Sequence, residues 1–128
     1  MSNSMDKGDA KVWFGATPPD LTLISRARQP EWLYTYLRAF YQDELRPYGV
    51  NNRVYPNVGM PHVLMELQGL AACSDKGGAA AAKAEQCVTM DMASAGAMSA
   101  QQFDGAMYDL VNFLAYTAEP YKSDRLRI

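Results

Sequence analysis

The sequence predicts a mainly α-helical domain. Two segments carry apolar residues at helical spacing, and the stretches around them are rich in proline, glycine or small side chains. The chain has 128 residues, which is enough for one domain with a modest core. Apolar residues make up 48% of it and charged residues 20%, a balance that is typical of globular proteins and not of disordered ones.

The first ten residues, MSNSMDKGDA, are polar, and we expect them to be an expression-derived or disordered start. They lack the apolar core of a secretory signal, and no run of about 18 apolar residues follows that could span a membrane. We therefore expect a soluble chain whose organised part covers residues 11–128.

Proline marks the entry to the first helices. Pro18 excludes Thr17 from the helical conformation, and Pro19 suits a first helical turn, so residues 11–22 should form a rigid loop before a short helix. Over residues 30–41, apolar side chains repeat at spacings of three and four, which predicts a clear amphipathic helix.

The middle of the chain is predicted to consist mainly of loops. Residues 43–62 hold three prolines, two glycines and three asparagines, which predicts a long ordered loop without helix or strand. Residues 63–70 are expected to form a short helix or strand. Residues 71–97 begin with small side chains and predict a surface excursion with little core, including a helical turn through four alanines at 79–82.

The last helix is the best defined. Ser99 is a good N-cap with Gln102 three residues on, which is a capping-box pattern, and Pro120 ends the helix. Its apolar stripe consists of Phe103, Met107, Leu110, Val111 and Leu114.

Composition limits the chemistry. The net charge of -2 and the lack of a basic run argue against nucleic-acid binding. The chain has one histidine, two cysteines and eight methionines, so a histidine-rich metal site is excluded. Cys73 and Cys87 are 14 positions apart and could form a disulfide in an oxidising compartment or remain free thiols in a reducing one.

One methionine is placed as a ligand would be. Met60 lies between Gly59 and Pro61 near the end of the long loop, and these neighbours fix its side chain in space. A thioether is a soft, neutral ligand that suits haem iron. The alternative is that Met60 fills a gap in the core, as most buried methionines do.

Four groups of residues occur in a recognisable order: 15–22 (GATPPDLT), 26–28 (RAR), 59–61 (GMP) and 111–120 (VNFLAYTAEP). In this order they resemble the cytochrome c1 family, the haem subunits of cytochrome bc1 complexes. The resemblance extends from about residue 11 to residue 127 and is weakest over 68–97. It implies a partial c-type cytochrome fold with long irregular loops.

The resemblance also implies roles for individual residues. Met60 matches the sixth iron ligand, and Arg28 matches the arginine that binds a haem propionate. Pro19 matches an apolar contact to the haem face, Trp32 an aromatic residue near the propionates, and Tyr55 the segment that leads into the ligand loop. Apart from the resemblance, the simplest interpretation of Arg28 is a solvated cation at a helix end. For Trp32 and Tyr55, packing in the core is as good an explanation as a role near a haem.

For the parent protein, the resemblance implies electron transfer from an iron–sulfur protein, through covalently bound haem c, to a soluble cytochrome c. The parent would associate with cytochrome b on the periplasmic side of a bacterial inner membrane, as a subunit of ubiquinol–cytochrome c oxidoreductase. The chain alone is not expected to be catalytic.

The sequence departs from the family in one decisive way. It has no Cys-x-x-Cys-His motif, which covalent haem attachment requires, and no membrane anchor. We therefore expect a fragment that lacks bound haem, with His62 as a surface imidazole. Because the stripe of the last helix would lack its partner helix, we also expect self-association through that exposed face.

Two other functions compete with this interpretation. The first is a haem-free helical interaction module that retains a cytochrome scaffold. The second is a small hydrolase that uses Asp20 or Asp104 with His62, which has no supporting spacing because no nucleophile or orienting partner accompanies the histidine.

Overall fold

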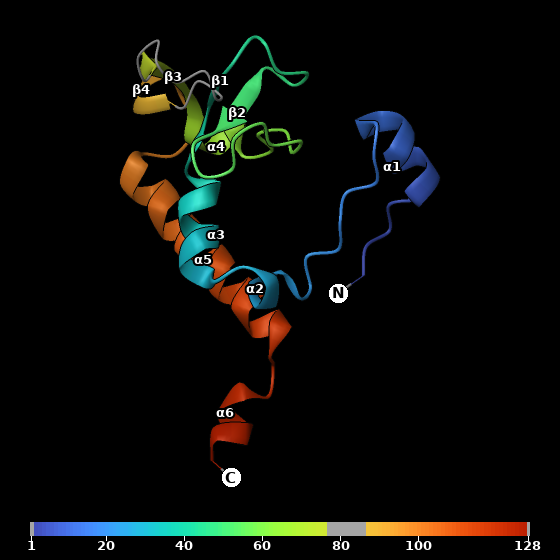
Figure 1. Ribbon diagram of the computed structural model, residues 1–128. Coiled ribbons are helices and arrows are strands. Elements are labelled where there is room, and N and C mark those ends of the chain that lie inside the picture. The colour runs from blue at the N-terminus through green and yellow to red at the C-terminus, as the bar shows by residue number, and fades with distance from the viewer. Residues whose placement is uncertain (1, 77–86, 128) are drawn as a thin grey trace.

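The structure, a computed structural model, describes residues 2–76 and 87–127 and is shown in Figure 1. It contains helices and a four-stranded mixed sheet, so the prediction of a mainly α-helical fold is wrong. In chain order the elements are α1 (Lys7–Phe14), α2 (Ile24–Ala27), α3 (Pro30–Leu37), β1 (Phe40–Gln42), β2 (Val50–Asn52), α4 (Met65–Gln68), β3 (Gly69–Lys76), β4 (Cys87–Ala95), α5 (Ala100–Ala118) and α6 (Lys122–Leu126).

The sheet has the strand order β2-β1-β3-β4. β1 pairs antiparallel with β2, with Phe40 opposite Asn52, and it pairs parallel with β3 through Gln42 and Ala72. β1 and β2 have three residues each. Strands this short show no alternating pattern in the sequence, which is why the sheet was not predicted.

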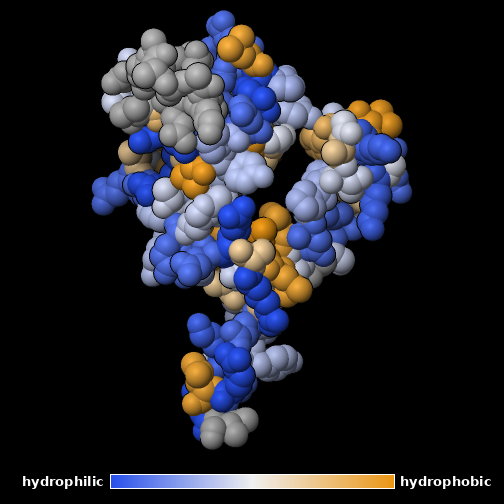
Figure 2. Space-filling view, viewed as in Figure 1, coloured by the Kyte–Doolittle hydropathy of each residue, from blue (hydrophilic) through white to orange (hydrophobic). Residues whose placement is uncertain are grey.

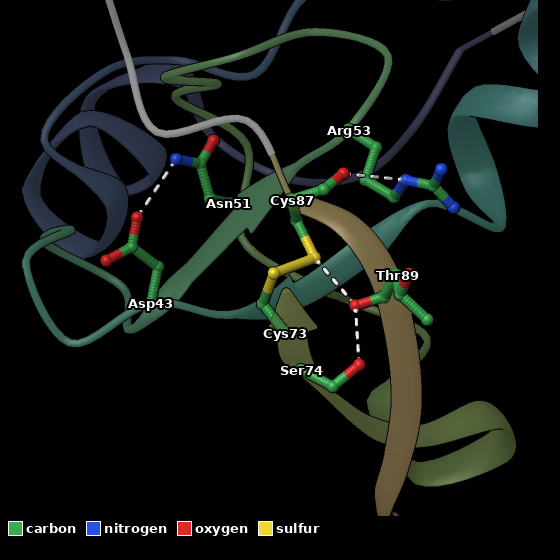
Figure 3. Close-up of a disulfide and its surroundings, with 7 residues drawn as sticks. All are labelled: Asp43, Asn51, Arg53, Cys73, Ser74, Cys87 and Thr89. Atoms are coloured by element: carbon green, nitrogen blue, oxygen red, sulfur yellow. Dashed lines mark hydrogen bonds between the residues drawn. A yellow bond between two sulfur atoms is a disulfide. The ribbon is translucent and has the colours of Figure 1, made fainter. Parts of the chain in front are cut away.

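β3 and β4 replace the predicted surface excursion over residues 71–97. They form an antiparallel hairpin in the sheet, in which Ala71 and Cys87 are buried against Tyr41. Cys73 and Cys87 form a disulfide with a Cα–Cα distance of 5.6 Å, which settles the open alternative (Figure 3). The predicted helical turn at 79–82 lies outside the described residues.

α5 confirms the prediction for the last helix. The Ser99 side chain accepts from the Gln102 amide, and the Gln102 side chain accepts from the Ser99 amide, which completes the capping box. One face of α5 packs on α3 and α2 (Figure 1). Its core residues Phe103, Met107 and Val111 are buried with two leucines of α3, Leu33 and Leu37.

This packing corrects the expectation of an uncovered stripe. Four of its five residues are buried within the chain, and Leu110 packs partly buried against the same cluster; the buried four are Phe103, Met107, Val111 and Leu114. The apolar face on which predicted self-association depended is therefore already covered by α3 and α2.

The helices of the first half also differ from expectation. α1 begins inside the predicted disordered start, because the Asp6 side chain caps it by accepting from the amides of Gly8 and Asp9. It ends at Phe14, so the first residues of the rigid loop predicted over 11–22 are helical instead. The helix predicted over 30–41 ends at Leu37, and Phe40 and Tyr41 enter β1 instead. Their apolar character continues the helical pattern, although their backbone is extended.

The long loop predicted over 43–62 is interrupted by β2, and residues 63–70 form both α4 and the start of β3. The turn between these two elements depends on Gly69, whose φ is +89°. A side chain there would collide with the backbone at Ser94 and Gly96, so the backbones of the two segments approach more closely than any other residue allows.

Apolar side chains remain on the surface of the first quarter of the chain. Val12, Trp13 and Leu23 are 82%, 64% and 55% exposed. Val12 and Trp13 belong to α1, which stands apart from the α3–α5 pair (Figure 1), and Figure 2 shows hydrophobic colour on part of this helix. Among the described residues, no helix combines the length and the hydropathy that crossing a membrane requires.

Candidate functional site

Met60 lies in the loop between β2 and α4 and faces α3. It is partly buried and packs against the cluster of Phe40, Val50 and Val58. The Tyr36 hydroxyl donates a hydrogen bond to its sulfur at 3.4 Å. The thioether is thus held at a defined position, because packing and a polar contact act on it together.

An aromatic column leads away from this sulfur. Trp32, Tyr36 and Phe40 follow one another at intervals of four residues along α3 and into β1. Trp32 stacks on Tyr36 with a centroid distance of 5.0 Å, and Tyr36 meets Phe40 edge to face at 5.5 Å. Burial and nearby Tyr55 raise the pKa of Tyr36, so its hydroxyl stays protonated and can donate at neutral pH.

Arg28 caps the outer end of the column. Its guanidinium carbon lies 4.6 Å from the Trp32 ring centroid and 5.9 Å from that of Tyr55. The two rings meet edge to face at 6.4 Å. Arg28 is exposed, so its charge faces solvent while its plane rests on aromatic surface.

His62 contradicts the expectation of a surface imidazole. It is only 7% exposed, and its ring stacks on Phe40 with a centroid distance of 4.9 Å and an angle of 7° between the planes. Burial lowers the pKa of His62, and the nearby Gly69 backbone and Gln68 side chain partly oppose that effect. The neutral ring therefore acts as part of the core.

Four of the five predicted site residues gather around the column, namely Met60, Arg28, Trp32 and Tyr55. The fifth, Pro19, is exposed between α1 and α2 and is not joined to them by these contacts. Tyr36 and Phe40 were not predicted as site residues, although each follows the previous aromatic residue by four positions, a spacing that would place Trp32, Tyr36 and Phe40 on one side of the helix expected over 30–41. That spacing was the available signal.

The candidate acids of a hydrolase are engaged elsewhere. Asp104 accepts from Arg38 Nε at 2.7 Å, and Asp20 accepts from the Thr22 hydroxyl at 2.6 Å. His62 is packed against Phe40. The arrangement therefore offers no orienting acid to the histidine, and within residues 2–76 and 87–127 no group of three or more His, Cys, Asp or Glu could hold a metal.

The donor set is compatible with a haem. Met60 would offer a neutral sulfur to its iron, and Arg28 would offer a cation to a propionate. The set does not fit covalent attachment, because both cysteines are joined to each other and the one histidine packs on Phe40.

The fold and the site define a small domain of mixed helix and sheet whose distinctive chemistry is a thioether, an aromatic column and a guanidinium. The sequence model of the Cytochrome C1 family matches residues 4–128, and the chain belongs to that family. This confirms the resemblance deduced from the sequence motifs.

The chain is similar to two curated relatives. Cytochrome c1 of Allochromatium vinosum is 44% identical over 133 aligned positions, which cover 100% of this chain and 52% of the relative. The ammonia monooxygenase gamma subunit of Nitrosomonas europaea is 40% identical over 121 positions, or 94% of this chain and 47% of that protein. The chain thus spans about half the length of the curated relatives it matches.

Proposed function

We propose that the chain is the ligand-bearing part of a cytochrome c1 electron-transfer domain, with Met60 as the sixth ligand of a haem c. Membership of the Cytochrome C1 family over residues 4–128 supports this proposal, together with the contact between Tyr36 and the Met60 sulfur. Haem, when bound, supplies one-electron redox chemistry. The attachment motif would lie on sequence other than these 128 residues.

The residues of the chain would have separate tasks. The neutral Met60 sulfur favours reduced iron, which raises the reduction potential. Arg28 would offset propionate charge, and Trp32 and Tyr55 would hold its guanidinium in place through their rings. The ring of Pro19 would provide apolar contact with the haem, which requires the segment before α2 to approach the cluster.

The parent would act as a subunit of ubiquinol–cytochrome c oxidoreductase. It would accept electrons from an iron–sulfur protein beside cytochrome b and pass them to a soluble cytochrome c on the periplasmic side of a bacterial inner membrane. The Cytochrome C1 family match supports this setting.

The test replaces the proposed ligand in the haem-bearing protein. Met60→Leu should lower the midpoint potential and open a coordination position to carbon monoxide, because leucine keeps the volume but has no sulfur. Met65→Leu is the matched control, since Met65 is 43% exposed on α4. An unchanged midpoint for Met60→Leu would show that Met60 is not the ligand.

A further inference from the structure

Two adjacent asparagines lie buried at the start of the loop that carries Met60. Asn51 and Asn52 end β2 and are 5% and 1% exposed. Asparagine side chains are mostly exposed in proteins, and burying their amides is costly unless every polar atom finds a partner. Both side chains should therefore have a purpose that an apolar residue could not serve.

The Asn52 side chain joins the loop to α3. Its oxygen accepts from the amides of Val54 and Tyr55 at 2.8 and 3.2 Å, and its nitrogen donates to the Tyr36 carbonyl at 2.9 Å. The opposite end of Tyr36, the hydroxyl, donates to the Met60 sulfur. One residue of α3 is thus bonded both to the beginning of the loop and to the residue that the loop presents.

The Asn51 side chain fixes the next part of the loop. Its oxygen accepts from the amides of Asn52 and Asn57, each at 2.8 Å, and its nitrogen donates to Asp43 Oδ2 at 3.0 Å (Figure 3). Asn57 is three residues before Met60 and has a φ of +59°, a conformation that asparagine adopts more readily than most residues.

The following residue anchors the loop from its other side. Arg53 Nε donates to the Cys87 carbonyl at 3.1 Å, and the Arg53 amide donates to the Ala39 carbonyl at 3.0 Å. Figure 3 shows the arginine reaching toward the hairpin beside the disulfide. The first residues of the loop are therefore bonded to β4, the end of α3 and the turn before β2, while Met60 lies at its far end.

We infer that Asn51 and Asn52 are positioning residues for Met60: they hold the backbone of residues 54–57 so that the sulfur meets Tyr36. This inference rests on the proposed function, because it concerns the residue proposed there as the ligand. Neither asparagine touches Met60 in these contacts. Each acts through the backbone of the loop, and Asn52 also acts through Tyr36.

The first test measures the loop in the 128-residue chain itself. Asn51→Asp keeps the oxygen that accepts from Asn57 but places a carboxylate against Asp43, so the amides of Val54, Tyr55 and Asn57 should exchange hydrogen about five to ten times faster. Asp43→Asn combined with Asn51→Asp reverses donor and acceptor and should restore slow exchange. If the double variant does not restore slow hydrogen exchange, the inference is overturned.

The second test measures the ligand in the haem-bearing protein. Asn51→Asp and Asn52→Leu should lower the midpoint potential and raise the fraction of reduced protein that binds carbon monoxide, and the Asp43→Asn combination should rescue the first variant. Val111→Ala, a core change in α5, is the control that lowers stability without changing carbon monoxide binding. Wild-type potential and carbon monoxide binding in both asparagine variants would overturn the inference.

The two tests separate this inference from the proposed function. If Met60→Leu leaves the midpoint unchanged, the proposed function fails, and hydrogen exchange still decides whether the asparagines hold the loop. If Met60→Leu lowers the midpoint and the asparagine variants do not, the ligand assignment stands and the positioning role fails.

Discussion

The Tyr36 hydroxyl donates to the Met60 sulfur across 3.4 Å, which joins two residues that are 24 positions apart in the chain. Tyr36 is fixed by its stacking on Trp32, and Met60 by the loop that follows β2. The contact therefore brings the aromatic helix and the ligand loop to one point. A hydrogen bond to sulfur withdraws electron density from it, so this tyrosine should tune the proposed ligand.

Tyr36→Phe tests that tuning. The variant keeps the ring and its stacking but loses the donor, so the sulfur should donate more strongly to oxidised iron and the midpoint potential of the haem-bearing protein should fall. The free energy of unfolding of the chain should fall by roughly 1 kcal/mol, the usual net value of one hydrogen bond. Redox titration and denaturant unfolding measure the two effects.

Tyr34→Phe is the control, because Tyr34 lies on the same helix beneath the Arg38 guanidinium, at 4.5 Å. A midpoint that falls equally in both variants would contradict a specific role for the Tyr36 hydroxyl.

The sequence predicted those parts of the fold that depend on neighbouring residues. The cap at Ser99 and the stripe of α5 are local patterns, and the structure confirms both. Met60 was found because its flanking residues restrict the backbone locally. Its place as iron ligand stays a prediction.

The sheet depends on contacts between distant residues, and the sequence does not show them. β3 and β4 carry alanine, serine and cysteine where strands usually carry branched and aromatic side chains, so their composition suggested a surface segment. Asn51 and Asn52 read as loop residues, because their partners at Tyr36 and Asp43 are assembled only by folding. The stacking of His62 on Phe40 was not predicted either, because these two residues also meet only on folding.

Arg28→Gln tests the proposed propionate contact. Glutamine keeps a planar, hydrogen-bonding group but removes the charge, and a cation near the iron disfavours the oxidised state, so its loss should lower the midpoint potential. Stability should change little, since exposed contacts between cations and rings contribute about 0.5–1 kcal/mol.

Arg26→Gln provides the matched control, because Arg26 lies two residues earlier, in α2, and donates to the Ala118 carbonyl at 2.8 Å. If the two variants give equal midpoints, Arg28 is an ordinary solvated cation. Titration at two salt concentrations strengthens the comparison, because salt screens exposed charges.

The disulfide between Cys73 and Cys87 gives a prediction about stability. It closes a loop with a sequence separation of 14, and cross-linking a loop of about 15 residues stabilises a fold by roughly 3 kcal/mol in the chain-entropy model. Reduction, or the double change Cys73→Ser with Cys87→Ser, should therefore lower the melting temperature. Thermal unfolding with and without a thiol reductant measures it.

Mass spectrometry under non-reducing and reducing conditions checks that the bond is present. The wild-type chain should gain the mass of two hydrogens on reduction, and the double variant should show neither this gain nor any response of its melting temperature to reductant. A wild-type chain with free thiols after purification in air would contradict the disulfide.

The turn before α2 gives a prediction about pH. Asp20 accepts from the Thr22 hydroxyl at 2.6 Å and from the Thr22 amide at 2.9 Å, and both bonds lower the pKa of this carboxyl below its ordinary 3.8. Because the folded state binds the proton less tightly than the unfolded state, the turn is stabilised above pH 3.8 and loses that stabilisation as the pH falls through the lower, folded value.

Thr22→Ala removes the hydroxyl and keeps the amide, so the titration midpoint of Asp20, followed by NMR, should rise toward 3.8 without reaching it. Thr17→Ala should leave the midpoint unmoved, since the Thr17 hydroxyl donates to the Lys7 carbonyl instead. A midpoint that stays the same in Thr22→Ala would mean that the Thr22 hydroxyl does not lower the pKa of Asp20.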